Sequence, residues 1–236
     1  MMKNIIFITA IFLVLVCECY AQVLENKNQA DLWSNNFRIV SYFIMGFWYY
    51  DKQKENFGTI QKVFLISIFI PIAVSLSSYL IDEKIAIIVN ISVNSMMFAS
   101  WVYVFKQLGA FITFKDSNRT IIKLMPAFLV LPMLFFYFSL YQSLPLLYSI
   151  FVFSYIIFFS YTGLLAGFLP IKEEKKLWII IAIVILVIVN FMNGYHTFLQ
   201  KLSWAYPVIR TLTVTSRCMM IYGMINYNEQ PTQGKQ

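Results

Sequence analysis

The sequence predicts an all-α fold, a polytopic transmembrane bundle of eight helices, or of seven if the first apolar run is a cleaved signal peptide. Hydrophobic residues make up 60% of the 236 residues and charged residues only 12%, with a mean hydropathy of +0.70. These values lie outside the range of ordinary globular domains. A spanning helix needs about 20 mostly apolar residues. Runs of this kind lie near 4–23, 34–50, 63–81, 85–105, 121–141, 144–169, 177–193 and 205–225.

The runs predict helices and not barrel strands, because they are continuously apolar and show no alternation between polar and apolar positions. In a bilayer the backbone polar groups of a single segment are satisfied only within a helix. The loops between the runs are short, so no soluble domain is left over. We therefore expect one integral membrane domain over residues 1–236, ending in a polar cytoplasmic tail over 226–236.

The first run has two interpretations. Lys3 precedes a twelve-residue apolar core, and a short segment around Ala21 is typical of a cleavage site, so residues 1–21 fit a signal peptide. The same residues also fit a retained first transmembrane helix. Neither interpretation changes the side of the membrane on which each later loop lies.

Prolines predict where several helices begin, bend or end. Pro145 and Pro207 fall at helix starts, where a missing N–H costs nothing. Pro170 follows the sixth run and closes it. Three others fall inside runs and predict kinks: Pro71, Pro126 and Pro132.

Basic residues are distributed unequally between alternate loops. Twelve fall on one side: Lys3, Lys52, Lys54, Lys62, Lys106, Lys115, Arg119, Lys123, Lys172, Lys175, Lys176 and Lys235. Five fall on the other: Lys27, Arg38, Lys84, Lys201 and Arg210. This bias predicts that the richer side is cytoplasmic. Both termini are then cytoplasmic if the first helix is retained, and the membrane is the inner membrane if the protein is bacterial. The net charge of +7 indicates contact with anionic lipids, and we expect no nucleic-acid partner.

Polar residues recur within three of the later runs. Asn90 and Asn94 share one face of the fourth helix, together with Met97 and Trp101. Asn190 lies near the end of the seventh. In the last helix Arg210, Thr213 and Arg217 form one stripe, because seven residues make nearly two turns. Asn90 and Asn94 are expected to act mainly as interhelical hydrogen-bonding groups.

Arg217 is the most informative of these residues, because a charge at mid-membrane is costly and marks function. All eleven acidic residues lie outside the runs or at their margins, so we expect no carboxylate at depth to pair with it. One hypothesis is a pocket for an anion or lipid headgroup, formed by Arg217 and Arg210 with the amides of Asn190, Asn94 and Asn90. The alternative is a structural arginine that bonds to helix carbonyls.

Few residues are suited to catalysis. His196 is the only histidine and the only plausible general base, although one histidine at an interface is more often ordinary surface. Three cysteines and a single histidine do not provide a plausible set of metal ligands. We therefore expect neither a metal nor a cofactor.

The chain resembles the YhhN-type, lysoplasmalogenase-like membrane proteins in helix order and in a few spaced residues. The family's His-x-x-Tyr falls on Ser100-Trp101-Val102-Tyr103, and its late Ser-Asp falls on Val189-Asn190 before Phe198. Ser41-Tyr42 stand where the family has a Lys-Pro pair in its second helix. The last helix, Arg210 to Gly223, matches in length and in its final Ile-x-Gly, with Arg217 where a glutamine is usual.

The resemblance implies an eight-helix fold and an activity, hydrolysis of the vinyl ether bond of lysoplasmalogens. That reaction needs groups that give and take protons, and serine and asparagine stand at the corresponding positions. The resemblance thus predicts a catalytically degenerate relative that binds membrane lipids and retains a lysophospholipid or ether-lipid headgroup pocket. Two alternatives are an active ether-lysolipid hydrolase with His196 as base, and a small transporter or sensor subunit.

Overall fold

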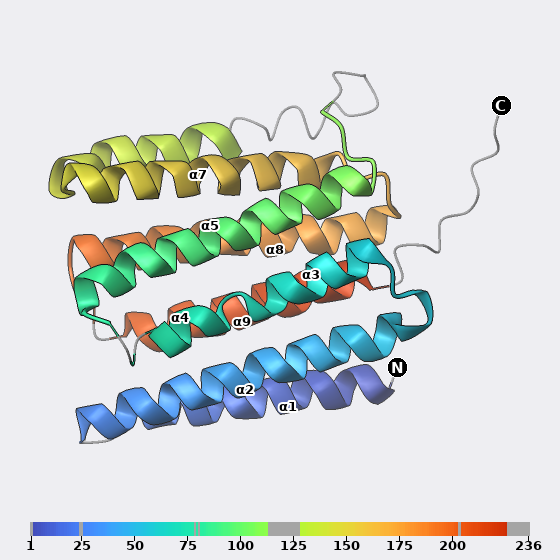
Figure 1. Ribbon diagram of the computed structural model, residues 1–236, viewed down its shortest axis with the longest axis horizontal. Helices are drawn as coiled ribbons and strands as arrows, with labels where there is room; N and C mark the ends of the chain where they lie inside the picture. The colour runs from blue at the N-terminus through green and yellow to red at the C-terminus, as the bar shows by residue number, and fades with distance from the viewer. Residues whose placement is uncertain are drawn as a thin grey trace.

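A computed structural model describes residues 2–23, 26–77, 79, 81–112, 128–202 and 204–225. In these ranges all regular structure is helical, as the sequence predicts (Figure 1). The helices are α1 (Met2–Ala21), α2 (Lys27–Gln53), α3 (Thr59–Phe69), α4 (Ile72–Ser77), α5 (Glu83–Gln107), α7 (Leu146–Gly167), α8 (Glu173–Phe198) and α9 (Ala205–Met224), with an apolar helical segment Phe128–Ser143 between α5 and α7.

Within the described residues, five segments are long and apolar enough to cross a membrane: Lys3–Ala21, Thr59–Ser77, Ile85–Gln107, Leu146–Gly167 and Glu173–Phe198. The remaining runs are helical where they are described, but α2 and α9 are less apolar. Both helices carry polar side chains on a face that is turned into the bundle, such as Ser41 and Arg217, which are buried. Part of their polarity therefore reflects an internal lining.

Pro71 interrupts the third run, as predicted. The chain turns at Ile70 and Pro71, so that one apolar stretch becomes α3 and α4. Pro132 lies inside a helical turn that passes directly into a π-helical turn, Phe136–Leu140. Turns of this kind often adjoin functional sites. Pro126 lies outside the described residues.

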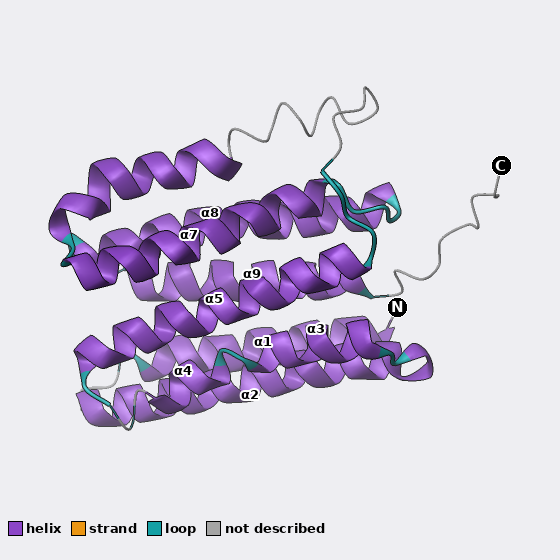
Figure 2. Cartoon of the chain, turned by 45° about the horizontal axis from the view of Figure 1, so that its top comes forward, coloured by secondary structure: helices purple, strands orange, loops and turns teal. Residues whose placement is uncertain are grey.

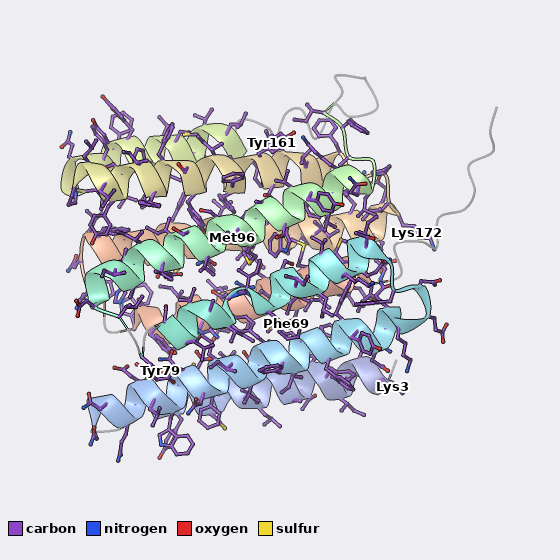
Figure 3. The ribbon with its side chains drawn as sticks, in the orientation of Figure 1. Lys3, Phe69, Tyr79, Met96, Tyr161 and Lys172 are labelled. Atoms are coloured by element: carbon purple, nitrogen blue, oxygen red, sulfur yellow. The ribbon has the colours of Figure 1, made fainter. Side chains whose placement is uncertain are left out.

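The helices run along one long axis in alternating directions (Figure 1). Lys3 and Lys172 lie at one end of the bundle and Tyr79 at the other, as the loop alternation predicts (Figure 3). Two of the five basic residues assigned to the poorer side lie well inside helices and not in a loop or at a helix end. Arg38 lies within α2 and Arg210 is buried in α9. This correction makes the inequality between the two ends larger.

α9 is the central helix of the bundle. Two views show it between α8 on one side and the α1/α2 pair on the other (Figures 1 and 2). Ten of its residues are buried, among them both arginines. The polar stripe predicted for this helix therefore points into protein.

α1 is packed along α2 and joined to it near both ends. Asn4 Oδ1 accepts a hydrogen bond from Trp48 Nε1 at 3.3 Å, and Gln22 Nε2 donates to Ser34 Oγ at 2.7 Å. Asn26 caps the start of α2, since its side chain accepts from the backbone N–H groups of the first turn. These contacts attach α1 to α2 and so to the rest of the bundle.

Trp101 was grouped by spacing with Asn90 and Asn94, but it has a structural role. Its Nε1 donates to Ser67 Oγ at 2.8 Å, which links α5 to α3, and both side chains are buried. Trp101→Phe should therefore lower the free energy of unfolding by about 1–2 kcal/mol, through a lost hydrogen bond and lost packing. Chemical unfolding in mixed micelles measures this change. Trp33→Phe is the control, because Trp33 is half exposed and its loss should have little effect.

Candidate functional site

A cavity of about 290 Å³ lies inside the bundle. Seven helical elements contribute to its wall: α2, α4, α5, the segment Phe128–Ser143, α7, α8 and α9, with Pro71 just before α4. The wall reaches the surface at Asn193, which is exposed near the end of α8. The five residues selected from the sequence all line this one cavity: Arg217, Arg210, Asn190, Asn94 and Asn90.

Arg217 lies in the deep part of the cavity wall and is only 7% exposed. Its Nε is buried without a hydrogen-bond partner. Among the described residues we find no carboxylate or carbonyl that accepts from its guanidinium. The closest recorded interaction is with the ring of Tyr42, whose centroid lies 5.0 Å from Cζ.

Asn190 is held in one orientation by its neighbour on α7. Tyr155 Oη donates to Asn190 Oδ1 at 2.7 Å, so the acceptor atom of the amide is occupied. Asn190 Nδ2 is buried and has no partner. Since Asn190 lines the cavity, its free donor is available to a ligand.

Asn90 and Asn94 bond to each other within α5. Asn94 Nδ2 donates to Asn90 Oδ1 at 2.6 Å and to the Asn90 backbone carbonyl at 2.8 Å. Within the described ranges neither amide is recorded bonding to a neighbouring helix. The expected interhelical role is therefore not what the geometry shows, and the pair forms a polar strip on the cavity wall.

Glu18 corrects the prediction that no carboxylate lies at depth. It is 0% exposed and forms a bidentate pair with Arg210, with Nε to Oε1 at 2.6 Å and Nη2 to Oε2 at 2.9 Å. Arg38 Nε donates to Oε1 at 3.2 Å. Tyr206 Oη donates to the same oxygen at 2.8 Å and accepts from Arg38 Nη2 at 2.9 Å.

This network gives the two arginines of α9 different roles. Arg210 is neutralised by Glu18 in a buried bidentate pair, whereas Arg217, two turns further along the helix, has no counter-charge. Glu18 does not line the cavity itself; it lies behind Arg38 and Arg210, which do. The described residues in and behind the cavity wall thus include three guanidinium groups and one carboxylate, a net charge of +2.

The rest of the wall is mainly apolar. Aromatic and aliphatic side chains from every contributing helix surround the polar groups, including Phe98, Phe135, Ile156 and Leu186. Phe135 stacks on Phe191 with centroids 4.6 Å apart. A cationic inner part and an apolar remainder suit a molecule that has an anionic group and a hydrophobic part.

His196 also lines the cavity, near the exposed end of α8. Its Nδ1 accepts from the Leu202 backbone N–H at 2.9 Å. The neutral imidazole then carries its proton on Nε2, which makes it a hydrogen-bond donor at its free nitrogen. A general base needs an unprotonated free nitrogen, so this geometry does not favour such a role.

In the described part of the chain, no group of three His, Cys, Asp or Glu side chains is placed to hold a metal ion. No protein-family model matches the sequence, and no curated protein or solved structure matches it. The interpretation of the cavity therefore depends on its own geometry.

Proposed function

We propose that this chain is a multi-pass integral membrane protein that binds an anionic amphiphile in its internal cavity without catalysing a reaction. One observation carries the proposal: a buried, uncompensated guanidinium, Arg217, lines a cavity whose remaining wall is mainly apolar. Leaving a charge unpaired in a low-dielectric interior costs several kcal/mol, and an anionic ligand would supply the missing partner.

The membrane setting follows from the five apolar helices. We propose that all eight predicted runs cross the bilayer, because α2 and α9 pack among the five and expose apolar residues such as Val40 and Phe47. The lysine-rich end of the bundle would face the cytoplasm. The exposed end of the cavity at Asn193 would then lie at the opposite surface.

The size of the cavity limits what it holds. At about 290 Å³ it is at the small end of small-molecule sites, enough for a headgroup and the first part of one chain. A single-chain lipid such as a lysophospholipid fits this description better than a two-chain lipid. The resemblance to YhhN-type proteins, which act on ether lysolipids, leads to the same ligand class.

Arg217→Leu should abolish most of the binding of an anionic single-chain lipid. Charge-assisted hydrogen bonds contribute about 1.5–3 kcal/mol, so we expect at least about a tenfold loss of affinity. The measurement is retention of oleoyl lysophosphatidylglycerol by the purified protein in lipid nanodiscs, quantified by mass spectrometry. Without bound lipid, the Arg217→Leu variant should be at least as stable as the natural protein, because leucine removes an unpaired buried charge.

Lys106→Leu is the matched control. Lys106 also lies over a tyrosine ring, with Nζ 5.4 Å from the centroid of Tyr161, but it is at the end of α5 and not among the residues that line the cavity. This variant should retain the lipid. Equal retention by Arg217→Leu and the natural protein would contradict the proposal.

A second candidate is an ether-lysolipid hydrolase, because His196 lines the same cavity as Arg217. The hydrogen bond from Leu202 argues against His196 as a base, and Glu18 already accepts four hydrogen bonds. We therefore expect no release of fatty aldehyde from lysoplasmalogens by the purified protein. Aldehyde release that disappears in His196→Ala would establish the hydrolase instead.

A further inference from the structure

We propose that the anionic group recognised in the cavity is a phosphate monoester, which carries two negative charges, and not a phosphodiester, which carries one. The inference depends on the proposed binding function and names the chemistry of its ligand. It rests on the charge of the site and on the orientation of its free donors.

The charge is the first step. Arg38, Arg210 and Arg217 are always protonated, and Glu18 is the one carboxylate recorded in contact with any of them. The other titratable side chains that line the cavity in the described helices are Tyr42 from α2, Tyr155 from α7, His196 from α8 and Tyr206 from α9, and none of them is a carboxylate. A ligand with a charge of −2 balances this set, whereas a charge of −1 leaves one cation without a partner.

The free donors are the second step. Arg217 Nε and Asn190 Nδ2 are both buried, unpartnered and in residues that line the cavity. Tyr155 already donates to the Asn190 oxygen, so the unpartnered atom of this side chain is its donor, Nδ2. A site with free donors suits an acceptor-only group, and the terminal oxygens of a phosphate monoester are three strong acceptors.

A phosphodiester fits the same site less well. Esterification of a second oxygen removes a charge and replaces a terminal acceptor with a substituent. That substituent would also have to share a cavity of about 290 Å³ with the rest of the ligand. Both effects favour the monoester, so the preference should appear in affinity and in its dependence on pH.

The test compares ligands of equal chain length on the natural protein. Oleoyl lysophosphatidic acid is the monoester, oleoyl lysophosphatidylglycerol is the anionic diester, and oleoyl lysophosphatidylcholine is the zwitterionic diester. Each competes with radiolabelled lysophosphatidic acid in a scintillation proximity assay on the solubilised protein. One additional charge-assisted interaction predicts a preference of about tenfold or more for the monoester.

The pH series separates charge from shape. The second ionisation of a phosphate monoester lies near about pH 6, so its advantage should decrease between about pH 7.5 and about pH 5.5 as the dianion takes up a proton. The diester has no ionisation in this range. His196 lines the same cavity, and the same series on His196→Gln gives the ratio without its imidazole.

Two further probes identify the source of the phosphate. If glycerol 3-phosphate and inorganic phosphate compete far more weakly than lysophosphatidic acid, the ligand is a lipid monoester. If they compete equally well and with the same pH dependence, the site binds phosphate without a lipid chain. The proposed preference for a dianionic phosphate then still holds. Arg217→Gln should weaken each monoester and reduce its advantage over the diester.

Equal affinity for lysophosphatidic acid and lysophosphatidylglycerol at every pH would overturn this inference and leave the proposed lipid-binding function in place. Absence of binding by any anionic probe would overturn the proposed function itself.

Discussion

Glu18→Ala should lower the free energy of unfolding by about 3–5 kcal/mol, the usual cost of removing one partner from a buried ion pair. The carboxylate is 0% exposed and accepts hydrogen bonds from Arg210, Arg38 and Tyr206. Without it, the guanidinium of Arg210 is buried without a partner in the centre of the bundle. The measurement is equilibrium unfolding in mixed micelles, with the melting temperature in mild detergent as a second observable.

Asp51→Ala is the matched control for this substitution. Asp51 also pairs with a basic residue, accepting from Lys54 Nζ at 3.0 Å, and that hydrogen bond lowers the pKa of the Asp51 carboxyl. The pair is at the end of α2 and open to solvent, where ion pairs contribute little. Its removal should leave the melting temperature unchanged.

A double variant tests whether the effect of Glu18 comes from the charge left behind. Glu18→Leu combined with Arg210→Leu removes the bidentate pair and leaves no buried charge between α1 and α9. It should be more stable than Glu18→Ala alone, because apolar replacement of a buried pair is often neutral or favourable. If the double variant loses as much free energy of unfolding as its two single substitutions added together, Glu18 and Arg210 are not energetically coupled.

The helical architecture could be predicted from the sequence because the length and continuity of apolar runs are local properties. Pro71 was correctly predicted to interrupt its helix, since its ring and missing N–H act within one turn. The bounds of α2 were less accurate: the apolar run covers 34–50, whereas the helix is Lys27–Gln53. Its first turns are mostly exposed and are helical because the Asn26 side chain caps their backbone N–H groups, which a hydropathy run does not detect.

The residues of the cavity were also predictable, because helical spacing places Arg210, Thr213 and Arg217 on one stripe. That stripe lines the cavity in the structure. The different roles of the two arginines were not predictable, since the partner of Arg210 is 192 residues away in sequence. Contacts at that separation depend on how the helices pack.

Glu18 was missed because it was interpreted as part of a polar margin. A local signal was nevertheless present. Ile11, Leu15 and Glu18 follow the i, i+4, i+7 spacing of one helical face, and all three are buried. An acid that continues the buried face of an apolar helix needs an internal cation. Arg38 and Arg210, at similar depth in their own helices, were the available partners.

Gly223→Ala should destabilise the protein by about 1–3 kcal/mol, the usual cost of overpacking. A Cβ at this position would lie 2.5 Å from Ile179 Cγ1 and 3.0 Å from the backbone oxygen of Lys175. The oxygen belongs to the first turns of α8 and cannot move without shifting that helix against α9. Unfolding in mixed micelles measures the loss.

Gly194→Ala is the matched control, and its effect on the free energy of unfolding should have the opposite sign. Gly194 also lies inside a helix, but an added Cβ would lie 3.4 Å from Phe135 Cε1 and 3.5 Å from Leu140 Cδ1, at ordinary contact distances. Alanine should therefore stabilise α8 by up to about 1 kcal/mol through the lower entropy of the unfolded chain. Equal effects of the two substitutions would mean that the close contact of α8 with α9 at Gly223 does not limit the size of the side chain there.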